Sequence, residues 1–352
     1  MSQVWTRQRA APWVLIITAL MFLATAVIAI GTGAVAIAPG KVVAILLGQA
    51  HPDITDAQRV VVLNVRLPRV LLALLAGAGL ACAGVMMQAL FRNPLADPAL
   101  IGVSAGAALG AVSVIVLGAT VLHGLALVLG VWTLPVAAFL GALATATLVF
   151  RLSQRDGVLD ATTMLLCGIA INALTGAGIG LLTYLATDEQ LRNLTFWSLG
   201  SMGGATWSSL LGAAPAIVLM VLVGPWLAHQ LNALLLGESE ALHLGVAVES
   251  LKRTVIALTA ASAGAVVAVS GVIGFVGLVA PHMARLLVGP DHRLVLPLAS
   301  LLGAMVLTAG DMVARTAVRP AELPIGILTA FIGAPFFLWL LRRRQGTEEA
   351  RP

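Results

Sequence analysis

Two arginines at the start of a long apolar run are the first residues in this chain that could bind a charged group. In the stretch NVRLPRVLLALLAGAG, residues 64–79, Arg66 and Arg69 flank Pro68, and the next charged residue is Arg92. Guanidinium groups stay charged and can hold a carboxylate through two hydrogen bonds. Two arginines so placed could receive acidic groups of another molecule or lie at the lipid headgroups, and the residues alone leave both interpretations open.

A third arginine of the same kind lies in GDMVARTAVRPAELP. Arg315 follows Asp311 by four residues. In a helix this spacing brings the two side chains together on one face. A local pair with Asp311 is therefore one interpretation of Arg315, and binding of an external carboxylate is the other.

No phosphate-binding loop is present to bind ATP. The GxxxxGK[ST] motif needs a lysine, and the chain has only Lys41 and Lys252. Lys41 follows Gly40, but Val42 replaces the hydroxyl residue and Val35 stands where the first glycine should be. The chain is therefore either a passive pore or a transporter whose energy is supplied by another chain.

Histidines are the commonest metal ligands, but those of this chain do not predict a site. All but His282 lie in predicted loops or at the ends of apolar runs, where a surface or capping role is expected, and His282 adjoins Pro281. We therefore expect no metal site, no catalytic residue and no cofactor bound by this chain. The histidines are His51, His123, His229, His243, His282 and His292.

The composition is that of an integral membrane protein. Of 352 residues, 60% are hydrophobic and 10% are charged, and the mean hydropathy is +1.02. Apolar runs of about 17 to 25 residues, enough to cross a bilayer as helices, recur along the chain. The predicted spans are 12–36, 67–91, 99–122, 129–150, 162–186, 208–228, 254–270, 272–288, 294–310 and 325–341. The middles of these spans lack Asp, Glu and Lys, which argues against an ion-coupled carrier.

Ten spans place both ends of the chain on one side of the membrane. With that side cytoplasmic, thirteen of the twenty Lys and Arg residues fall inside, as the positive-inside rule requires. The longest polar insertion, residues 229–253, also lies inside. Its leucines recur at helical spacing and Gly237 and Gly245 interrupt it, which predicts two short amphipathic helices. Binding of this segment to a negatively charged lipid surface is disfavoured by its acidic residues Glu238, Glu240 and Glu249. A partner protein is therefore expected there.

Several long strings together resemble one family. They are RLPRVLLALLAGAGLACAGVMMQALFRNPLADPALIGVSAGA (66–107), FWSLGSMGGATW (196–207), LLLGESEALHLGV (234–246), GVIGFVGLVAPHMARLLVGPDHR (271–293) and AELPIGILTAFIGAPFFLWLL (321–341). In this order they are similar to the FecCD-type permease subunits of type II ATP-binding-cassette (ABC) importers, which carry haem, iron siderophores or cobalamin. The resemblance covers nearly the whole chain.

The resemblance implies an all-α integral membrane protein of about ten transmembrane helices, a single permease domain over residues 1–352. It implies a homodimer in the bacterial inner membrane, two cytoplasmic ATPase subunits that use ATP with Mg²⁺, and a periplasmic binding protein. No nucleic-acid partner is expected. Haem is the favoured cargo, because FWSLGSMGGATW looks closest to haem permeases; a ferric siderophore or cobalamin is the alternative.

The resemblance also assigns roles to individual residues. It implies that Arg66, Arg69 and Arg315 dock the binding protein at the outer face. It places contacts to the ATPase at Glu238, Glu240 and Gly245, in the inner segment 229–253. It places the cytoplasmic gate at two pairs of residues: Asn93 and Leu95 in FRNPLADP, and Ala161 and Thr162 in LDATTMLLCG. Ala161 departs from the small hydroxyl residue expected at that position, which puts the second pair in doubt.

Overall fold

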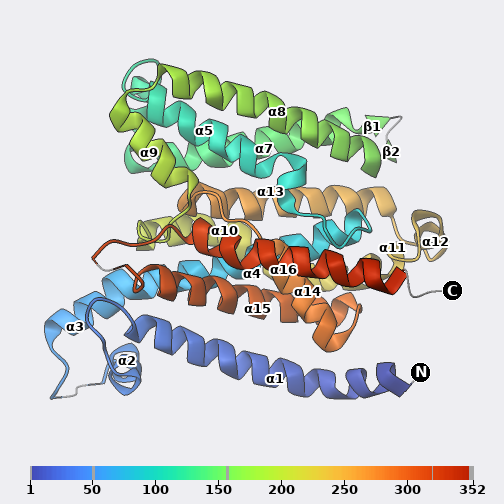
Figure 1. Ribbon diagram of the computed structural model, residues 1–352, viewed down its shortest axis with the longest axis horizontal. Coiled ribbons are helices and arrows are strands. Elements are labelled where there is room, and N and C mark those ends of the chain that lie inside the picture. The colour runs from blue at the N-terminus through green and yellow to red at the C-terminus, as the bar shows by residue number, and fades with distance from the viewer. Residues whose placement is uncertain (1, 50–51, 156–157, 319, 349–352) are drawn as a thin grey trace.

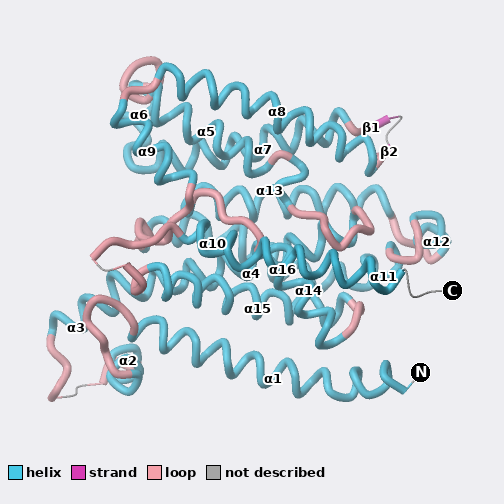
Figure 2. Tube along the Cα trace, viewed as in Figure 1, coloured by secondary structure: helices cyan, strands magenta, loops and turns pink. Residues whose placement is uncertain are grey.

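The fold is helical over nearly all the regular structure of the computed structural model, which describes residues 2–49, 52–155, 158–318 and 320–348 (Figures 1 and 2). This confirms the expected fold class. The longer helices are α1 (Ser2–Gly31), α4 (Leu67–Leu90), α5 (Val103–Leu117), α7 (Thr133–Leu152), α8 (Ala161–Leu185), α10 (Trp207–Val223), α13 (Val248–Ser270), α14 (Val276–Val288), α15 (His292–Ala314) and α16 (Ile325–Glu348).

Short elements connect the longer helices. They are α2 (Pro39–Leu46), α3 (Asp56–Val60), a π turn (Val61–Arg66), 3-10 turns at Pro98–Ile101, Gly130–Trp132 and Gly224–Leu227, α6 (His123–Leu129), α9 (Asp188–Ser198), α11 (Ala228–Leu234), α12 (Glu238–His243) and the hairpin strands β1 (Gln154–Arg155) and β2 (Val158–Leu159). Side-chain caps fix several helix starts: Thr187 and Gln190 form a capping box at α9, and Thr206 and Ser209 form one at α10.

Each of the ten predicted spans overlaps one of the longer helices. Within the described residues, seven helices are long and apolar enough to cross a membrane, and α5, α14 and the apolar part of α16, Ile325–Leu338, are shorter. The eighth span was predicted to begin at residue 272, but α14 begins at Val276. Gly271 and Phe275 have φ of +70° and +67°, so the backbone between α13 and α14 leaves the helical region.

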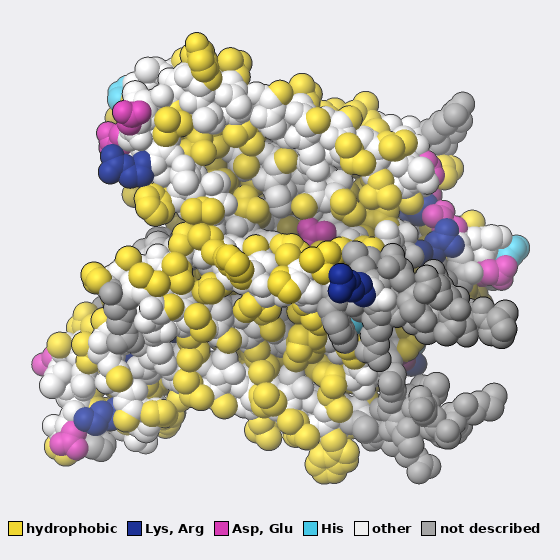
Figure 3. Space-filling model, in the orientation of Figure 1, with side chains coloured by type: hydrophobic (Ala, Val, Ile, Leu, Met, Phe, Trp, Pro, Cys, Tyr) yellow, Lys and Arg dark blue, Asp and Glu magenta, His cyan; other side chains and the backbone are white. Residues whose placement is uncertain are grey.

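The helices form two groups with α13 between them (Figure 1). One group holds α5, α7 and α8, and the other holds α1, α4, α10, α14, α15 and α16. The first turn of α1 and the last turn of α16 lie at the same end as α11 and α12, whereas α2, α3 and α9 lie at the opposite end. Figure 3 shows hydrophobic side chains over the middle of the visible face and most charged ones toward the two ends. We call the end with α12 the coupling end and the end with α3 the docking end.

Helix α4 is the most buried span, and glycines let its neighbours approach it closely. A Cβ atom on Gly84 would overlap the backbone of Gly277 in α14, and one on Gly77 would overlap the backbone of Gly303 in α15. Such backbone contacts replace side-chain packing in membrane helix bundles, where apolar burial alone gives little driving force. The position of α4 in the bundle therefore depends on these glycines.

Replacing Gly84 with alanine is expected to lower the free energy of unfolding by about 1–3 kcal/mol, because the added methyl group overpacks the contact with Gly277. Unfolding in detergent by increasing denaturant measures this change. Gly176→Ala is the matched control, since Gly176 lies in α8 with nothing within 4 Å of an added Cβ. Equal stability of the two variants would show that the close contact does not hold α4 in place.

Candidate functional site

Arg66 is buried at the docking end, with 6% of its surface exposed. Its Nη1 donates hydrogen bonds to the carbonyl oxygens of Ile30, at 3.1 Å, and Gly31, at 2.9 Å, and its Nη2 donates to the carbonyl oxygen of Val35. These carbonyls lie at the end of α1 and just beyond it, where helical partners are missing. Arg66 thus fixes the chain where it leaves α1.

Arg69 forms the centre of an ion-pair cluster. Its Nη2 lies 2.8 Å from Asp311 Oδ1 and 2.9 Å from Glu322 Oε2. Its Nε also donates to both carboxylate oxygens of Asp311, so that pair is bidentate. Asp311 is 1% exposed, whereas Glu322 is 43% exposed. The hydrogen bonds from Arg69 hold the pKa of Glu322 below its usual value.

Arg315 joins the same cluster. Its Nε lies 3.5 Å from Asp311 Oδ2, and its Nη2 donates to the carbonyl oxygen of Ala29 at 2.7 Å. The local pair with Asp311, raised from the four-residue spacing, is therefore present. Burial lowers the pKa of Arg315, although the charge of Asp311 opposes that shift.

The three predicted docking arginines thus lie together around one depression at the docking end. The depression holds about 1080 Å³ of empty space, and Glu322 also lines it. All three arginines have partners within the chain, so their role in binding another protein stays a prediction. Sequence reasoning missed Glu322, although it stands in the same quoted string as Arg315.

At the coupling end, the predicted pair of short helices is confirmed by α11 and α12. Gly237 precedes α12 and Gly245 follows it, with φ of +125° and +81°. L-amino acids with a side chain rarely adopt such values, which explains both glycines. The polar insertion ends earlier than the predicted residue 253, because α13 already begins at Val248.

Lys252 links three segments at this end and is completely buried. Its Nζ lies 2.7 Å from Glu238 Oε2, 3.2 Å from Glu249 Oε1 and 2.8 Å from the carbonyl oxygen of Leu159. The ammonium group thereby joins α12, α13 and strand β2. Glu238, predicted to contact an ATPase, is paired within the chain, although its side chain is 37% exposed.

The other predicted coupling residues, Glu240 and Gly245, are exposed. The side chain of Glu240 makes no hydrogen bond or ion pair within the part of the chain that the structure describes. Large apolar side chains stand beside it: Leu236, Leu242 and Leu244 are 68%, 60% and 63% exposed. An exposed apolar surface at the polar end of a membrane protein suits a protein partner.

The predicted gate residues lie on two segments, the turn after α4 and the first turn of α8. Asn93 Oδ1 accepts a hydrogen bond from the Leu95 amide at 3.0 Å in the turn after α4. The 3-10 turn that follows packs on α8, where Asn172 donates to the carbonyl oxygen of Ala99 at 3.2 Å. Ala161 and Thr162 form the first turn of α8. Nothing in these contacts tests the gating role, which stays a prediction.

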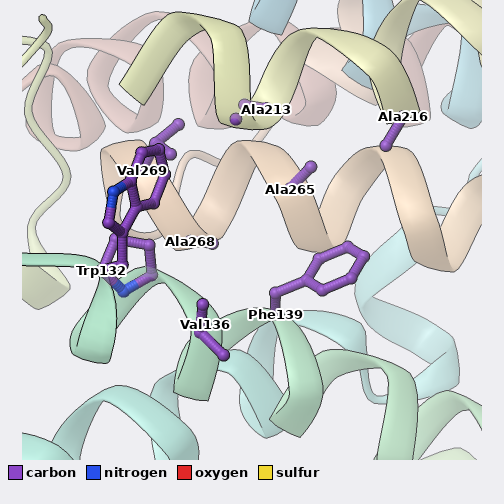
Figure 4. Close-up of a pocket in the computed structure, with 10 residues that line it drawn as sticks. Trp132, Val136, Phe139, Ala213, Ala216, Ala265, Ala268 and Val269 are labelled. Carbon is purple, nitrogen blue, oxygen red and sulfur yellow. The ribbon is translucent and has the colours of Figure 1, made fainter. Parts of the chain in front are cut away.

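An apolar cavity lies between α7, α10 and α13, with about 450 Å³ of empty space (Figure 4). Figure 4 shows Trp132 and Phe139 at opposite ends of the cavity, with the small residues Ala265 and Ala268 of α13 between them. No ionisable side chain lines it. Among the described residues, no cluster of three His, Cys, Asp or Glu could hold a metal ion.

Comparisons with known proteins agree with this helical membrane fold. Residues 20–343 match the FecCD transport family. The chain belongs to this family. It is 50% identical over 290 residues to the hemin transport system permease protein HmuU of Yersinia pestis, a match that covers 82% of this chain and 85% of that protein.

Two further relatives of the FecCD chain show the breadth of the family. The cobalamin import system permease protein BtuC of Halobacterium salinarum is 41% identical over 306 residues, covering 86% of this chain and 79% of that protein. A solved chain, described as a metal-chelate type ABC transporter in an inward-facing conformation, is 37% identical. That structural match has a TM-score of 0.82 and covers 94% of this chain and 99% of the other.

The FecCD chain is thus a multi-pass membrane protein and the permease subunit of an ABC importer. It is the non-catalytic transmembrane component, which implies a separate ATPase and a binding protein as partners. The resemblance read from the sequence motifs is confirmed.

Proposed function

We propose that this permease moves haem inward while a separate subunit hydrolyses ATP. The observation that carries the proposal is the 50% identity to a hemin permease, against 41% and 40% for two cobalamin permeases. Cargo-lining residues must release a bulky ligand as readily as they admit it, so a membrane pathway need not carry strong ligands for iron. The paucity of ion-coupling carboxylates in the predicted spans also favours external power.

Uptake by proteoliposomes tests the cargo. The vesicles hold the permease and its cognate ATPase, and they are offered haem, a ferric siderophore and cobalamin in turn, each on its own binding protein. Uptake of haem well above the other two supports the proposal. Preferential uptake of another chelate would reject haem as the cargo and keep the importer mechanism.

The assembly that we propose is a homodimer with two ATPase subunits, in which residues 1–352 form one permease domain. Both ends of the chain would lie in the cytoplasm of a bacterial cell, at the inner membrane. The positive-inside count supports this orientation, as does the placement of the exposed leucines of α12 at the end where the ATPase would bind. ATP with Mg²⁺ would be bound by the ATPase, with no cofactor in this chain.

We place the ATPase contact on α12 and its flanking turns, at Glu238, Glu240 and Gly245. The exposed leucines supply apolar surface, and Lys252 ties α12 to the start of α13. Movement of α12 would thereby reach a membrane-spanning helix directly. Ala161 and Thr162 of the proposed cytoplasmic gate follow Leu159 closely in the chain, and Lys252 also holds the carbonyl of Leu159. Asn93 and Leu95 form the other part of the proposed gate.

We place the binding protein at the docking end, on the cluster of Arg66, Arg69 and Arg315. Arg69 is the candidate for exchange, because its partner Glu322 is partly exposed and could give way to a carboxylate from outside. Arg66 would act by holding the surrounding chain, since its donors are used by backbone carbonyls.

Replacing Glu322 with glutamine is expected to tighten docking of the binding protein by about two- to fivefold. The Glu322 carboxylate would no longer compete with an incoming carboxylate for Arg69, and an exposed ion pair contributes a free energy of this size. Titration of the labelled binding protein onto the purified permease complex measures the dissociation constant. Glu189→Gln on α9 is the control, since Glu189 is an exposed acid at the same end. Docking that is unchanged or weaker than in the control variant would reject Arg69 as the receiving group.

A further inference from the structure

A groove runs between α7 and α13 toward the coupling end. It holds about 660 Å³ of empty space, and its lining is apolar apart from Thr147 and Arg253. The lining residues are Leu143, Ala146, Thr147, Phe150, Arg253, Ile256, Ala257 and Ala260. On each helix they recur every three or four residues, so the groove follows one face of each helix.

The groove lies at the depth of the membrane. Both helices belong to segments long and apolar enough to span a bilayer, His123–Leu152 and Val248–Ser270. From Leu143 to Phe150 the helix rises about 10 Å, which fits within the roughly 15 Å of hydrocarbon in one leaflet. Leu140 and Leu148 of α7, next to the groove, are 57% and 43% exposed. An open apolar groove flanked by exposed leucines is suited to contact with lipid.

The end of the groove carries positive charge without a partner. Arg253 is exposed, and its side chain forms no hydrogen bond or ion pair with any described residue. The nearby acid Glu249 is already bound to Lys252 and to the amide of Leu159. Arg151 follows Phe150 and lies four residues after Thr147, so it stands at the same end of the α7 face. An arginine above an apolar groove complements a phosphate above an acyl chain.

We propose that this groove binds one anionic phospholipid, with its acyl chain between α7 and α13 and its phosphate on Arg253. The ligand class follows from the charge: a permanently charged guanidinium can hold phosphate oxygens through paired hydrogen bonds. Basic pockets between membrane helices are a known setting for acidic headgroups.

Farther from the coupling end, the same two helices also line the apolar cavity of Trp132 and Phe139 (Figure 4). Gly264 and Ala142 form a close contact between the two hollows. The anionic lipid therefore occupies the part near Arg253, and the binding requires only that the chain is embedded in a membrane. It does not depend on which cargo is carried.

Native mass spectrometry of the purified transporter complex tests the proposal. The complex is titrated with phosphatidylglycerol or with phosphatidylcholine, and bound lipids are counted. The wild type is expected to retain phosphatidylglycerol preferentially. Arg253→Gln is expected to weaken that binding by about fivefold, the effect of one basic residue near an acidic lipid, and to leave phosphatidylcholine unchanged. Arg192→Gln, at an exposed arginine of α9, is the control.

A second variant separates the groove from the charge. Ala257 is exposed in the groove, so Ala257→Phe fills the space without disturbing the core and is expected to reduce retention of both lipids. Equal phosphatidylglycerol binding by the Arg253 and Arg192 variants would overturn the proposal. Loss of the second permease copy in the Ala257 variant, with lipid retention unchanged, would overturn it in favour of a subunit interface.

Discussion

Replacing Arg69 with alanine is expected to lower the free energy of unfolding by about 3–5 kcal/mol, the cost of leaving one member of a buried pair without its partner. Asp311 is 1% exposed and would lose its bidentate partner, while Arg315 stays at 3.5 Å. Because Arg315 still neutralises part of the Asp311 charge, the loss of unfolding free energy is expected to lie near the lower end of this range. Denaturant titration in mixed micelles measures it, and Arg192→Ala, at an exposed position of α9, is the control.

A double variant distinguishes the ion pair from general packing. Arg69→Leu with Asp311→Leu removes both charges and is expected to recover much of the stability lost in Arg69→Leu alone. If the losses of stability from the two single changes simply add, Arg69 and Asp311 do not stabilise each other. That result would reject the ion pair as a source of stability at the docking end. Recovered stability together with weak docking of the binding protein would show that Arg69 both stabilises the fold and binds the partner.

Replacing Lys252 with methionine is expected to lower the amount of cargo moved per ATP hydrolysed at least tenfold. The methionine keeps most of the buried volume but frees Glu238, Glu249 and the carbonyl of Leu159 together. Helix α12 would then no longer be tied to α13. Stability is also expected to fall, by about 1–3 kcal/mol, because a buried carbonyl loses its donor.

The measurement is the ratio of cargo uptake to ATP hydrolysis in proteoliposomes with the ATPase and binding protein. Lys41→Met is the control, since the chain's other lysine lies at the docking end, where it donates to the carbonyl oxygen of Asp53 at 2.8 Å. A normal ratio in the Lys252 variant would show that coupling passes by another route. A lowered ratio with intact binding of the ATPase would assign the defect to transmission.

The membrane spans and the two short helices at the coupling end could be predicted from the sequence, because both depend on local patterns. Continuous apolar runs identify helices that cross a bilayer, and glycines mark where α12 begins and ends. The start of α14 was predicted four residues too early, since hydrophobicity alone does not reveal the positive φ of Gly271 and Phe275.

The partners of the charged residues could not be predicted in the same way. Arg69 and Asp311 are 242 positions apart, and only the packing of α4 against α15 brings them together. Lys252 lies in the predicted polar insertion 229–253, yet its side chain is fully buried. It donates to the carbonyl oxygen of Leu159, 93 positions away in the sequence. The three docking arginines were selected by position in the topology, and their intramolecular bonds appear only in the folded chain.

The most direct test of the account is haem uptake by proteoliposomes that contain this permease, its ATPase and a haem-loaded binding protein, compared with and without hydrolysable ATP. The account predicts haem accumulation that requires ATP hydrolysis and stops when the ATPase is omitted. Haem accumulation that continues without ATP or without the ATPase would contradict it.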